Sequence, residues 1–221
     1  MKVARLVTGA FQENCYLAIA SDGSAAAVDP GADATSVLAA LRDAGATLRA
    51  VLLTHGHLDH LSALPALLAA APGTPVRMAA ADAAWCFTRA NSIPPYEPVL
   101  EPPASLAPVS DGDELAVGDL RLRVLATPGH SPGGVCYFAD ADGARPPVLF
   151  SGDTLFRASI GRTDFPGSSW EDMEASLRRL AALPPETRVL PGHGDPTTIA
   201  AERELNPFLA PLLEEDPGRN P

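Results

Sequence analysis

Short strand-like runs alternate with helical patterns along the chain, and this alternation constrains the fold more than any other feature. The runs are short, rich in apolar residues and often followed by glycine, proline or aspartate. Such alternation is typical of chains whose helices cover the faces of sheets, so we expect an α/β sandwich. The expected strands are Arg5–Thr8, Cys15–Ala20, Ala25–Val28, Leu48–Leu53, Leu120–Ala126, Val148–Phe150 and Val189–Leu190.

Four segments carry helical patterning. The helix opened by Ser169 has Asp172 three residues on, which is the spacing of a capping box. The proline-rich segment Ile93–Pro108 cannot form a regular interior element, so we expect a surface loop there. The expected helices are one begun by Asp33 or Thr35 and ended before Gly45, Ser62–Ala71, the helix opened by Ser169, and Ala201–Leu205, interrupted by Pro207.

Length, charge and cysteine usage exclude several classes of protein. With 221 residues we expect one domain over 1–221 with a frayed tail at 214–221. The net charge is −11 and no Lys/Arg cluster exists to meet phosphates, so nucleic acid is not an expected partner. No apolar run is long enough to span a bilayer and no signal peptide is visible, so we expect a cytoplasmic protein without a membrane partner. The three cysteines form no CxxC pair, which argues against a disulfide framework or a thiolate zinc site.

All five histidines follow the ends of expected strands. Three of them and an aspartate lie within one six-residue segment, H-G-H-L-D-H at 55–60, which closely follows the expected strand Leu48–Leu53. A single histidine beside glycine is more often a turn residue, but crowding three titratable groups into one loop favours a metal site. Imidazole and carboxylate are preferred ligands of zinc and similar ions, and residues beyond strand ends gather at one edge of a sheet. The candidate ligands are His55, His57, Asp59, His60, His130, Asp153 and His193. Asp29 also follows a strand, but Asp-Pro-Gly is a sufficient turn, so we leave it out.

The HxHxDH run at 55–60, with His130, Asp153 and His193 after it in that order, resembles the metallo-β-lactamase-fold hydrolases over nearly the whole chain. The resemblance implies an αββα sandwich with the metal site at the edge of the two sheets. It also implies two divalent ions, most simply zinc, with iron or manganese as alternatives. The β-lactamases proper use a cysteine ligand that has no counterpart here, so antibiotic hydrolysis is not expected. The implied ligands are His55, His57 and His130 for one ion and Asp59, His60 and His193 for the other, with Asp153 bridging both.

Two further segments, Gly152–Phe156 and Gly161–Phe165, resemble the glyoxalase II branch, the hydroxyacylglutathione hydrolases. Phe11–Tyr16 and Val28–Gly31 resemble its short bacterial members. The resemblance implies hydrolysis of a glutathione thioester, S-lactoylglutathione, by a hydroxide shared between the metals, with Asp59 and Asp153 as catalytic residues. Too few residues follow His193 for the C-terminal helical domain that binds glutathione in full-length members.

Arg162 is the expected substrate-binding residue. Glyoxalase II enzymes have a lysine that contacts glutathione nine residues after the bridging aspartate, and arginine stands there in this chain. The alternative is that Arg162 pairs with Asp164 and only holds its loop. Thr54 and Ser131 lie next to candidate ligands, although nearness in sequence does not make them hydrogen-bond partners of those ligands.

A different reaction class remains open within the same resemblance. Persulfide dioxygenases share this fold, the HxHxDH run and a GRTDF segment. They would use one iron on two histidines and one carboxylate, here His55, His130 and Asp153. We favour hydrolysis because Ser159–Gly167 is more similar to the short glyoxalase II-like hydrolases. The oligomeric state does not follow from the sequence.

Overall fold

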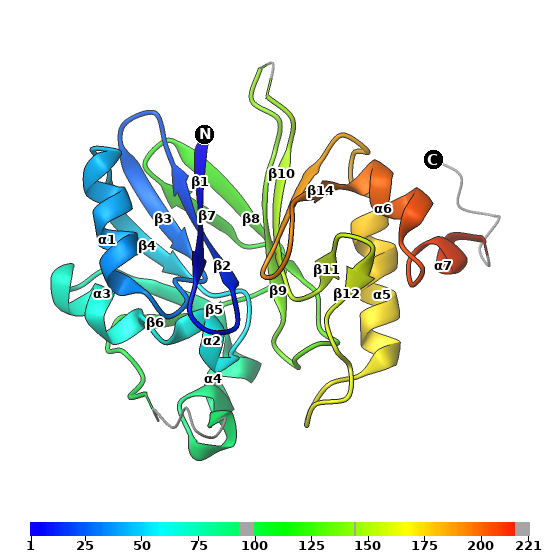
Figure 1. The fold of residues 1–221 in the computed structure, drawn as a ribbon, viewed down its shortest axis with the longest axis horizontal. Coiled ribbons are helices and arrows are strands. Elements are labelled where there is room, and N and C mark those ends of the chain that lie inside the picture. The colour runs from blue at the N-terminus through cyan, green and yellow to red at the C-terminus, as the bar shows by residue number, and fades with distance from the viewer. Residues whose placement is uncertain (93–99, 144, 215–221) are drawn as a thin grey trace.

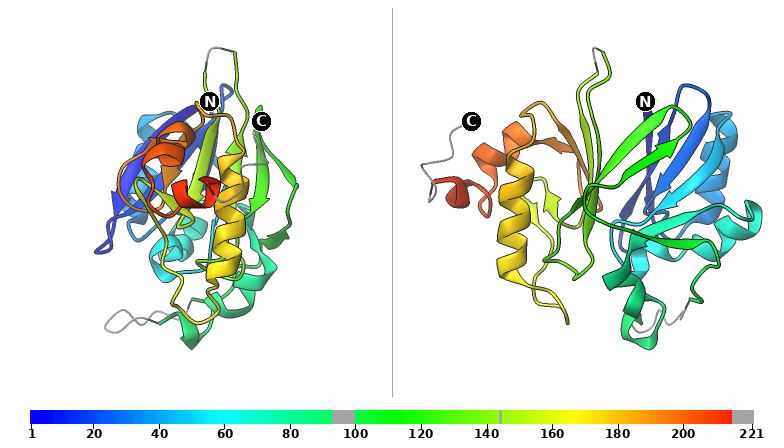
Figure 2. Two further views of the ribbon diagram at one scale, coloured as in Figure 1. Left: turned by 90° about the vertical axis from the view of Figure 1, so that its right-hand side faces the viewer. Right: turned by 180° about the vertical axis from the view of Figure 1, so that it is seen from behind.

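Two six-stranded sheets pack face to face, and helices cover the outer face of each (Figure 1). The computed structural model describes residues 1–92, 100–143 and 145–214. Seen from behind, the same four layers follow one another as helix, sheet, sheet and helix (Figure 2). This confirms the α/β sandwich that the sequence pattern predicts and the αββα order that the resemblance implies.

The first sheet follows chain order. Its first three strands are antiparallel, and the next three are added in parallel. The strands are β1 (Lys2–Thr8), β2 (Glu13–Ile19), β3 (Ser24–Val28), β4 (Thr47–Leu52), β5 (Val76–Ala79) and β6 (Leu106–Val109).

The second sheet has the order β14-β13-β10-β9-β8-β7. Only β10 and β13 are parallel among its described neighbours. The strands are β7 (Glu114–Val117), β8 (Leu120–Ala126), β9 (Val135–Ala139), β10 (Val148–Gly152), β13 (Arg188–Pro191) and β14 (Thr197–Thr198). A separate small hairpin joins β11 (Leu155–Phe156) to β12 (Ser159–Ile160).

Strand β2 shows how the sequence fills two cores at once. Cys15, Leu17 and Ile19 pack with the helix layer, whereas Tyr16 and Ala18 pack between the sheets. Because successive side chains of a strand point to opposite faces, a strand covered on both sides must be apolar throughout. A third core lies between the second sheet and its helices.

Two of the longer helices begin at a capping residue that the sequence predicts. Asp33 accepts a hydrogen bond from Ser36 N (3.0 Å), and Ser169 Oγ accepts one from Asp172 N (3.2 Å). Both caps are the predicted ones. The helices over the first sheet are α1 (Ala34–Asp43), α2 (Leu58–Leu61), α3 (Leu64–Ala70), α4 (Ala80–Cys86) and the 3-10 turn η1 (Arg89–Asn91); those over the second are α5 (Trp170–Ala181), α6 (Ile199–Leu205) and α7 (Ala210–Glu214).

The predicted surface loop Ile93–Pro108 is wrong at its end, because β6 begins at Leu106. Residues 93–99 lie outside the described residues. β6 is an edge strand that pairs in parallel with β5. Proline is tolerated at a sheet edge, since its missing N–H can face away from the ladder.

The prediction is also wrong for the start of one helix and for the identity of the last strand. The helix expected over Ser62–Ala71 begins at Leu64, because α2 already occupies the end of the histidine loop. Val189–Leu190 is not the last strand, because β14 follows and pairs antiparallel with β13. Of the predicted frayed tail, Glu214 ends α7 and the remaining residues lie outside the described ones. Among the described helices, none has the length and apolar character needed to cross a membrane.

Candidate metal centre

The loops that follow β4, β8, β10 and β13 meet at one edge of the sandwich, and they bring all seven predicted ligands together. The HxHxDH loop follows β4 and runs into α2, while each of the other three loops supplies one ligand. Parallel strands β3, β4 and β5 end at this edge, as do β10 and β13 in the other sheet. The carboxyl ends of parallel strands are where open α/β sheets form their sites.

Three groups of three candidate ligand atoms are found in the described residues, and two of them consist of predicted ligands alone; the third joins Asp29 to His55 and His60. Within each group the atoms lie within 4.8 Å of one another. In the first group His57 Nδ1 lies 2.9 Å from His130 Nε2, and in the second Asp59 Oδ2 lies 3.2 Å from His193 Nε2. Four ligand atoms around one tetrahedral zinc ion lie roughly 3.3–3.6 Å apart. The first group is His55, His57 and His130, and the second is Asp59, His60 and His193.

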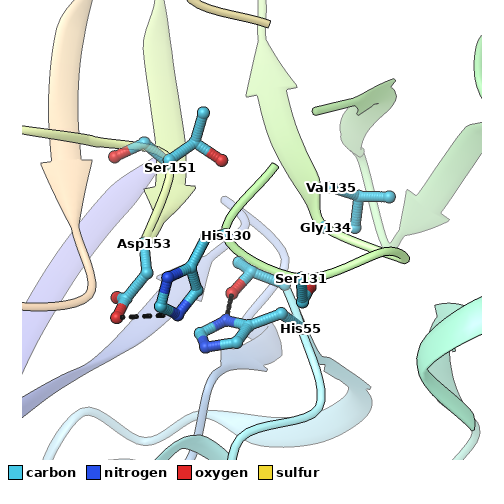
Figure 3. A pocket seen from close by; sticks show the side chains of 9 residues that line it. His55, His130, Ser131, Gly134, Val135, Ser151 and Asp153 are labelled. Carbon is cyan, nitrogen blue, oxygen red and sulfur yellow. Dashed lines mark hydrogen bonds and ion pairs between the residues drawn. The ribbon is translucent and has the colours of Figure 1, made fainter. Parts of the chain in front are cut away.

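Asp153 lies between the two groups. Its Oδ2 is 3.5 Å from His130 Nε2 in the first group and 3.6 Å from His193 Nε2 in the second. Its Oδ1 is 3.4 Å from His60 Nε2. Figure 3 shows Asp153, His130 and His55 side by side at the edge of a small cavity of about 10 Å³. Asp153 therefore occupies the position expected of a bridging carboxylate.

Several ligand atoms are buried without a hydrogen bond. His55 Nε2, His60 Nε2 and Asp153 Oδ1 are three of the five such side-chain atoms in the described part of the chain. Buried polar atoms without a hydrogen bond are rare, because each costs free energy. Three of them at one place, on residue types that zinc prefers, fit a bound divalent ion.

A single buried carboxylate fixes the protonation of two of these histidines. The hydroxyl of Thr54 donates a hydrogen bond to Asp29 Oδ2 (2.7 Å). Because its own proton is used there, the hydroxyl oxygen must accept a hydrogen bond from His55 Nδ1, which lies 3.0 Å away. His60 Nδ1 donates directly to the same Asp29 oxygen (3.0 Å). In its neutral form each ring therefore presents an unprotonated Nε2 to the site. From the sequence alone Asp29 is a turn residue, and the contact of Thr54 with His55 does not follow from their nearness in the chain.

His130 is oriented from the opposite side. Its Nδ1 donates to the backbone carbonyl of Arg162 (2.8 Å), which in the neutral ring leaves Nε2 unprotonated and facing the predicted ligands. This contact requires Gly161, because a Cβ there would lie 1.9 Å from Asp153 O and 2.9 Å from His130 Nδ1. The Gly161–Phe165 segment thus positions a ligand through its backbone. The hydroxyl of Ser131, in contrast, donates to Asp82 (2.8 Å).

Asp82, which sequence reasoning missed, joins two of the ligand-bearing loops. Its carboxylate is fully buried and accepts hydrogen bonds from Gly56 N (2.7 Å), Gly133 N (2.7 Å), Ser131 Oγ and Trp85 Nε1. Gly56 lies between two histidines of the first loop, and Gly133 lies three residues after His130. No turn or motif marks Asp82 in the sequence, because its partners are brought to it by the fold.

We expect Asp82→Ala to lower the free energy of unfolding by about 2 kcal/mol or more, because buried N–H groups lose their acceptor. Urea unfolding of the metal-free protein measures this change. Asp119→Ala is the matched control, since that exposed carboxylate accepts two hydrogen bonds from Ser21. Equal stability of the two variants would contradict the role assigned to Asp82.

The two groups differ in how readily their histidines hold a proton. Burial, together with the neighbouring histidines, lowers the pKa of His55 well below its usual value and brings that of His57 to about 3. Burial also disfavours the charged form of His60, but the carboxylates of Asp153, Asp59 and Asp29 outweigh it and raise its pKa. The pKa of His193 is raised in the same way, since the hydrogen bond to Asp59 and the charge of Asp153 oppose burial.

A cleft of about 600 Å³ opens over the ligands. Arg162 lines it, and its guanidinium forms a bidentate pair with Asp164 (2.8 and 2.9 Å). Both side chains are about two-thirds exposed, at 65% and 67%. The pairing alternative for Arg162 is therefore present in the structure, although the side chain also lies at the cleft.

The comparisons with known proteins agree with this geometry. The model of a family described as the metallo-beta-lactamase superfamily matches residues 8–193. The chain is 36% identical to the "Probable metallo-hydrolase YqgX" of Bacillus subtilis, over 95% of this chain and 98% of that protein. It is 32% identical to the "Hydroxyacylglutathione hydrolase GloC" of Haemophilus influenzae, over 95% and 98%.

Solved structures are similar over nearly their whole length. The BLEG-1 B3 metallo-beta-lactamase has a TM-score of 0.85 at 35% identity, covering 94% of this chain and 99% of that one. TTHA1623 in a di-iron-bound form has a TM-score of 0.81 at 39% identity, covering 93% and 100%. ETHE1 from Myxococcus xanthus has a TM-score of 0.74 at 28% identity, covering 99% and 93%.

Proposed function

This chain belongs to the metallo-β-lactamase superfamily. We propose that it is a metallo-hydrolase and that it hydrolyses glutathione-type thioesters with two bound divalent metal ions. The observation that carries the proposal is the pair of three-ligand groups with Asp153 between them. Support for the thioester comes from the similarity to a protein named as a hydroxyacylglutathione hydrolase. Support for two ions comes from the similarity to a protein solved with two irons.

In this proposal His55, His57 and His130 hold one ion, and Asp59, His60 and His193 hold the other. Asp153 would contact both, and Asp59 would also orient a water molecule at the second ion. Bound there, two divalent ions lower the pKa of a water molecule toward ~7 and polarise a carbonyl group. We propose zinc as the metal, with iron or manganese as alternatives. Asp29 and Thr54 keep the ligand nitrogens of His55 and His60 unprotonated.

Turnover of S-lactoylglutathione tests the proposal. The protein loaded with zinc is expected to hydrolyse it faster than nitrocefin or a lactone. The nitrocefin arm matters because a similar structure is described as a B3 metallo-beta-lactamase. Failure on several glutathione thioesters, with clear turnover of nitrocefin, a lactone or a phosphodiester, would overturn the thioester assignment and keep the metallo-hydrolase.

A mononuclear iron dioxygenase of the same fold is the second candidate function. It would need only His55, His130 and Asp153 as ligands, and the similarity to ETHE1 gives it some support. The hydrolase is favoured because the described residues also bring Asp59, His60 and His193 into a second group. A single iron would leave that group without a role.

We propose that Arg162 binds a substrate carboxylate at the mouth of the cleft. Exposed ion pairs contribute only about 0–1 kcal/mol, so Asp164 does not prevent a substrate from competing for the guanidinium. Arg162→Ala is expected to raise the KM for a glutathione thioester about tenfold, the equivalent of 1.4 kcal/mol, with metals retained and kcat less affected.

The matched variant is Asp164→Ala. If Arg162 binds substrate, removing its competitor lowers KM or leaves it unchanged, whereas Arg162→Ala raises KM. If Arg162 only holds its loop through the pair, the two variants behave alike. An unchanged KM in Arg162→Ala with metal content intact would refute the binding role.

Lowering the pH is expected to release the ion of the second group first. Imidazole binds a metal only when it is neutral. Because the pKa values of His60 and His193 are raised, protons compete for them at a higher pH than for His55 and His57, whose pKa values are lowered. Elemental analysis after dialysis between about pH 8 and about pH 4 measures this order. Loss of both ions together, or of the first group's ion first, would contradict it.

A further inference from the structure

Aromatic side chains stand directly against the proposed ligands inside the cleft. The ring of Phe165 lies 5.1 Å from that of His57 and 5.7 Å from that of His130. The ring centroid of Trp85, which lies on α4, is 5.5 Å from that of His57. The ring centroid of Phe156 is 6.1 Å from that of His193, which belongs to the second group. The apolar wall of the cleft therefore begins at the metal site itself.

The deep part of the cleft holds no charge other than that of proposed ligands. Among the described lining residues the charged ones are Asp59, Asp153 and Arg162. Asp59 and Asp153 are proposed ligands, and Arg162 is 65% exposed and stacks over Phe165 at 4.3 Å. Asn91 also lines the cleft, but its amide nitrogen donates to the backbone carbonyls of Gly56 and Cys86.

These surroundings determine which part of a thioester fits where. The scissile carbonyl must lie at the metals, so the acyl group, attached directly to it, lies against the aromatic rings. A charged or strongly polar acyl group would lose its hydration there without gaining a partner. The charged groups of a glutathione carrier lie several bonds beyond the sulfur, within reach of the cleft mouth and Arg162.

We infer, resting on the proposed function, that the acyl group is uncharged and apolar, either aromatic or branched aliphatic. A cleft of about 600 Å³ is large enough for such a group. The methyl group of a lactoyl thioester would leave most of the aromatic wall without a contact. Apolar burial against Trp85, Phe156 and Phe165 would discriminate between acyl groups through kcat/KM.

Two thioesters that differ by one group test the inference. S-mandeloylglutathione carries a phenyl group where S-lactoylglutathione carries a methyl group, and everything else is the same. The zinc-loaded protein is expected to show a kcat/KM at least about tenfold higher for the mandeloyl thioester. Phe165→Ala is expected to reduce this ratio, with zinc content checked. The control Phe208→Ala, which removes an exposed ring that contacts Trp170, is expected to leave it unchanged.

A binding measurement separates the inference from the proposed function. The chain has two tryptophans, so Trp170→Phe makes Trp85 the sole reporter of the cleft. Mandelate is expected to change its fluorescence at a concentration at least about tenfold lower than lactate does. Equal affinities, or equal kcat/KM for the two thioesters, would overturn the apolar acyl site. Absence of hydrolysis of both thioesters, with mandelate still bound more tightly, would instead overturn the proposed function.

Discussion

Replacing Asp153 with alanine is expected to remove both metal ions and to lower thioester hydrolysis by roughly a thousandfold or more. Asp153 Oδ2 is 3.5 Å from His130 Nε2 in the first group and 3.6 Å from His193 Nε2 in the second. Removing the carboxylate therefore takes a proposed ligand from both ions at once. The loss should exceed the roughly 10–100-fold effect of residues that only orient ligands. Metal content per chain, measured beside activity, checks the result.

His193→Ala is the matched variant for this prediction. His193 belongs only to the second group, so its loss should release one ion and keep the other. If Asp153→Ala loses a single ion, as His193→Ala does, Asp153 does not bridge. If His193→Ala keeps two ions per chain, the assignment of His193 as a ligand is wrong.

Asp29→Asn is expected to weaken the binding of both ions, by roughly 10–100-fold for each. The two oxygens of the Asp29 carboxylate accept hydrogen bonds from Thr54 N, Thr54 Oγ1 and His60 Nδ1. An asparagine presents one NH₂ group in place of an oxygen, so at least one of these donors then faces a donor. If the NH₂ group replaces Oδ2, which faces Thr54 Oγ1 and His60 Nδ1, the tautomers of His55 and His60 are no longer both fixed. Competition with a metal chelator measures the affinities.

Thr54→Val separates the two branches of this network. Thr54 connects Asp29 to His55 but not to His60, which contacts Asp29 directly. The valine variant should therefore weaken only the ion of the first group. Equal weakening of both ions by Thr54→Val, or unchanged affinities in Asp29→Asn, would contradict the network.

The sequence predicted those parts of the molecule that depend on local patterns. The caps at Asp33 and Ser169 are confirmed, because a cap and its partner lie three residues apart. The sandwich and the convergence of the histidine-bearing loops also follow from the pattern, since strand ends meet at a sheet edge. The pairing of Arg162 with Asp164 could also be considered from the sequence, because the two residues are only two positions apart.

The features that were missed depend on residues far apart in the chain. Asp29 and Thr54 are 25 residues apart, and Asp82 and Ser131 are 49 apart, so no local pattern joins them. β5 and β6 are four residues each and form only by pairing with a neighbouring strand. The aromatic wall of the cleft likewise collects Trp85, Phe156 and Phe165 from separate segments. These contacts exist only in the folded chain.

Metal stoichiometry tests the central claim most directly. The protein purified without chelator is analysed for its elements, and oxygen uptake with glutathione persulfide is measured on the same sample. We expect about two divalent ions per chain, hydrolysis of glutathione thioesters and no oxygen uptake. One iron per chain with oxygen uptake would contradict this expectation and assign the site to a mononuclear dioxygenase on His55, His130 and Asp153.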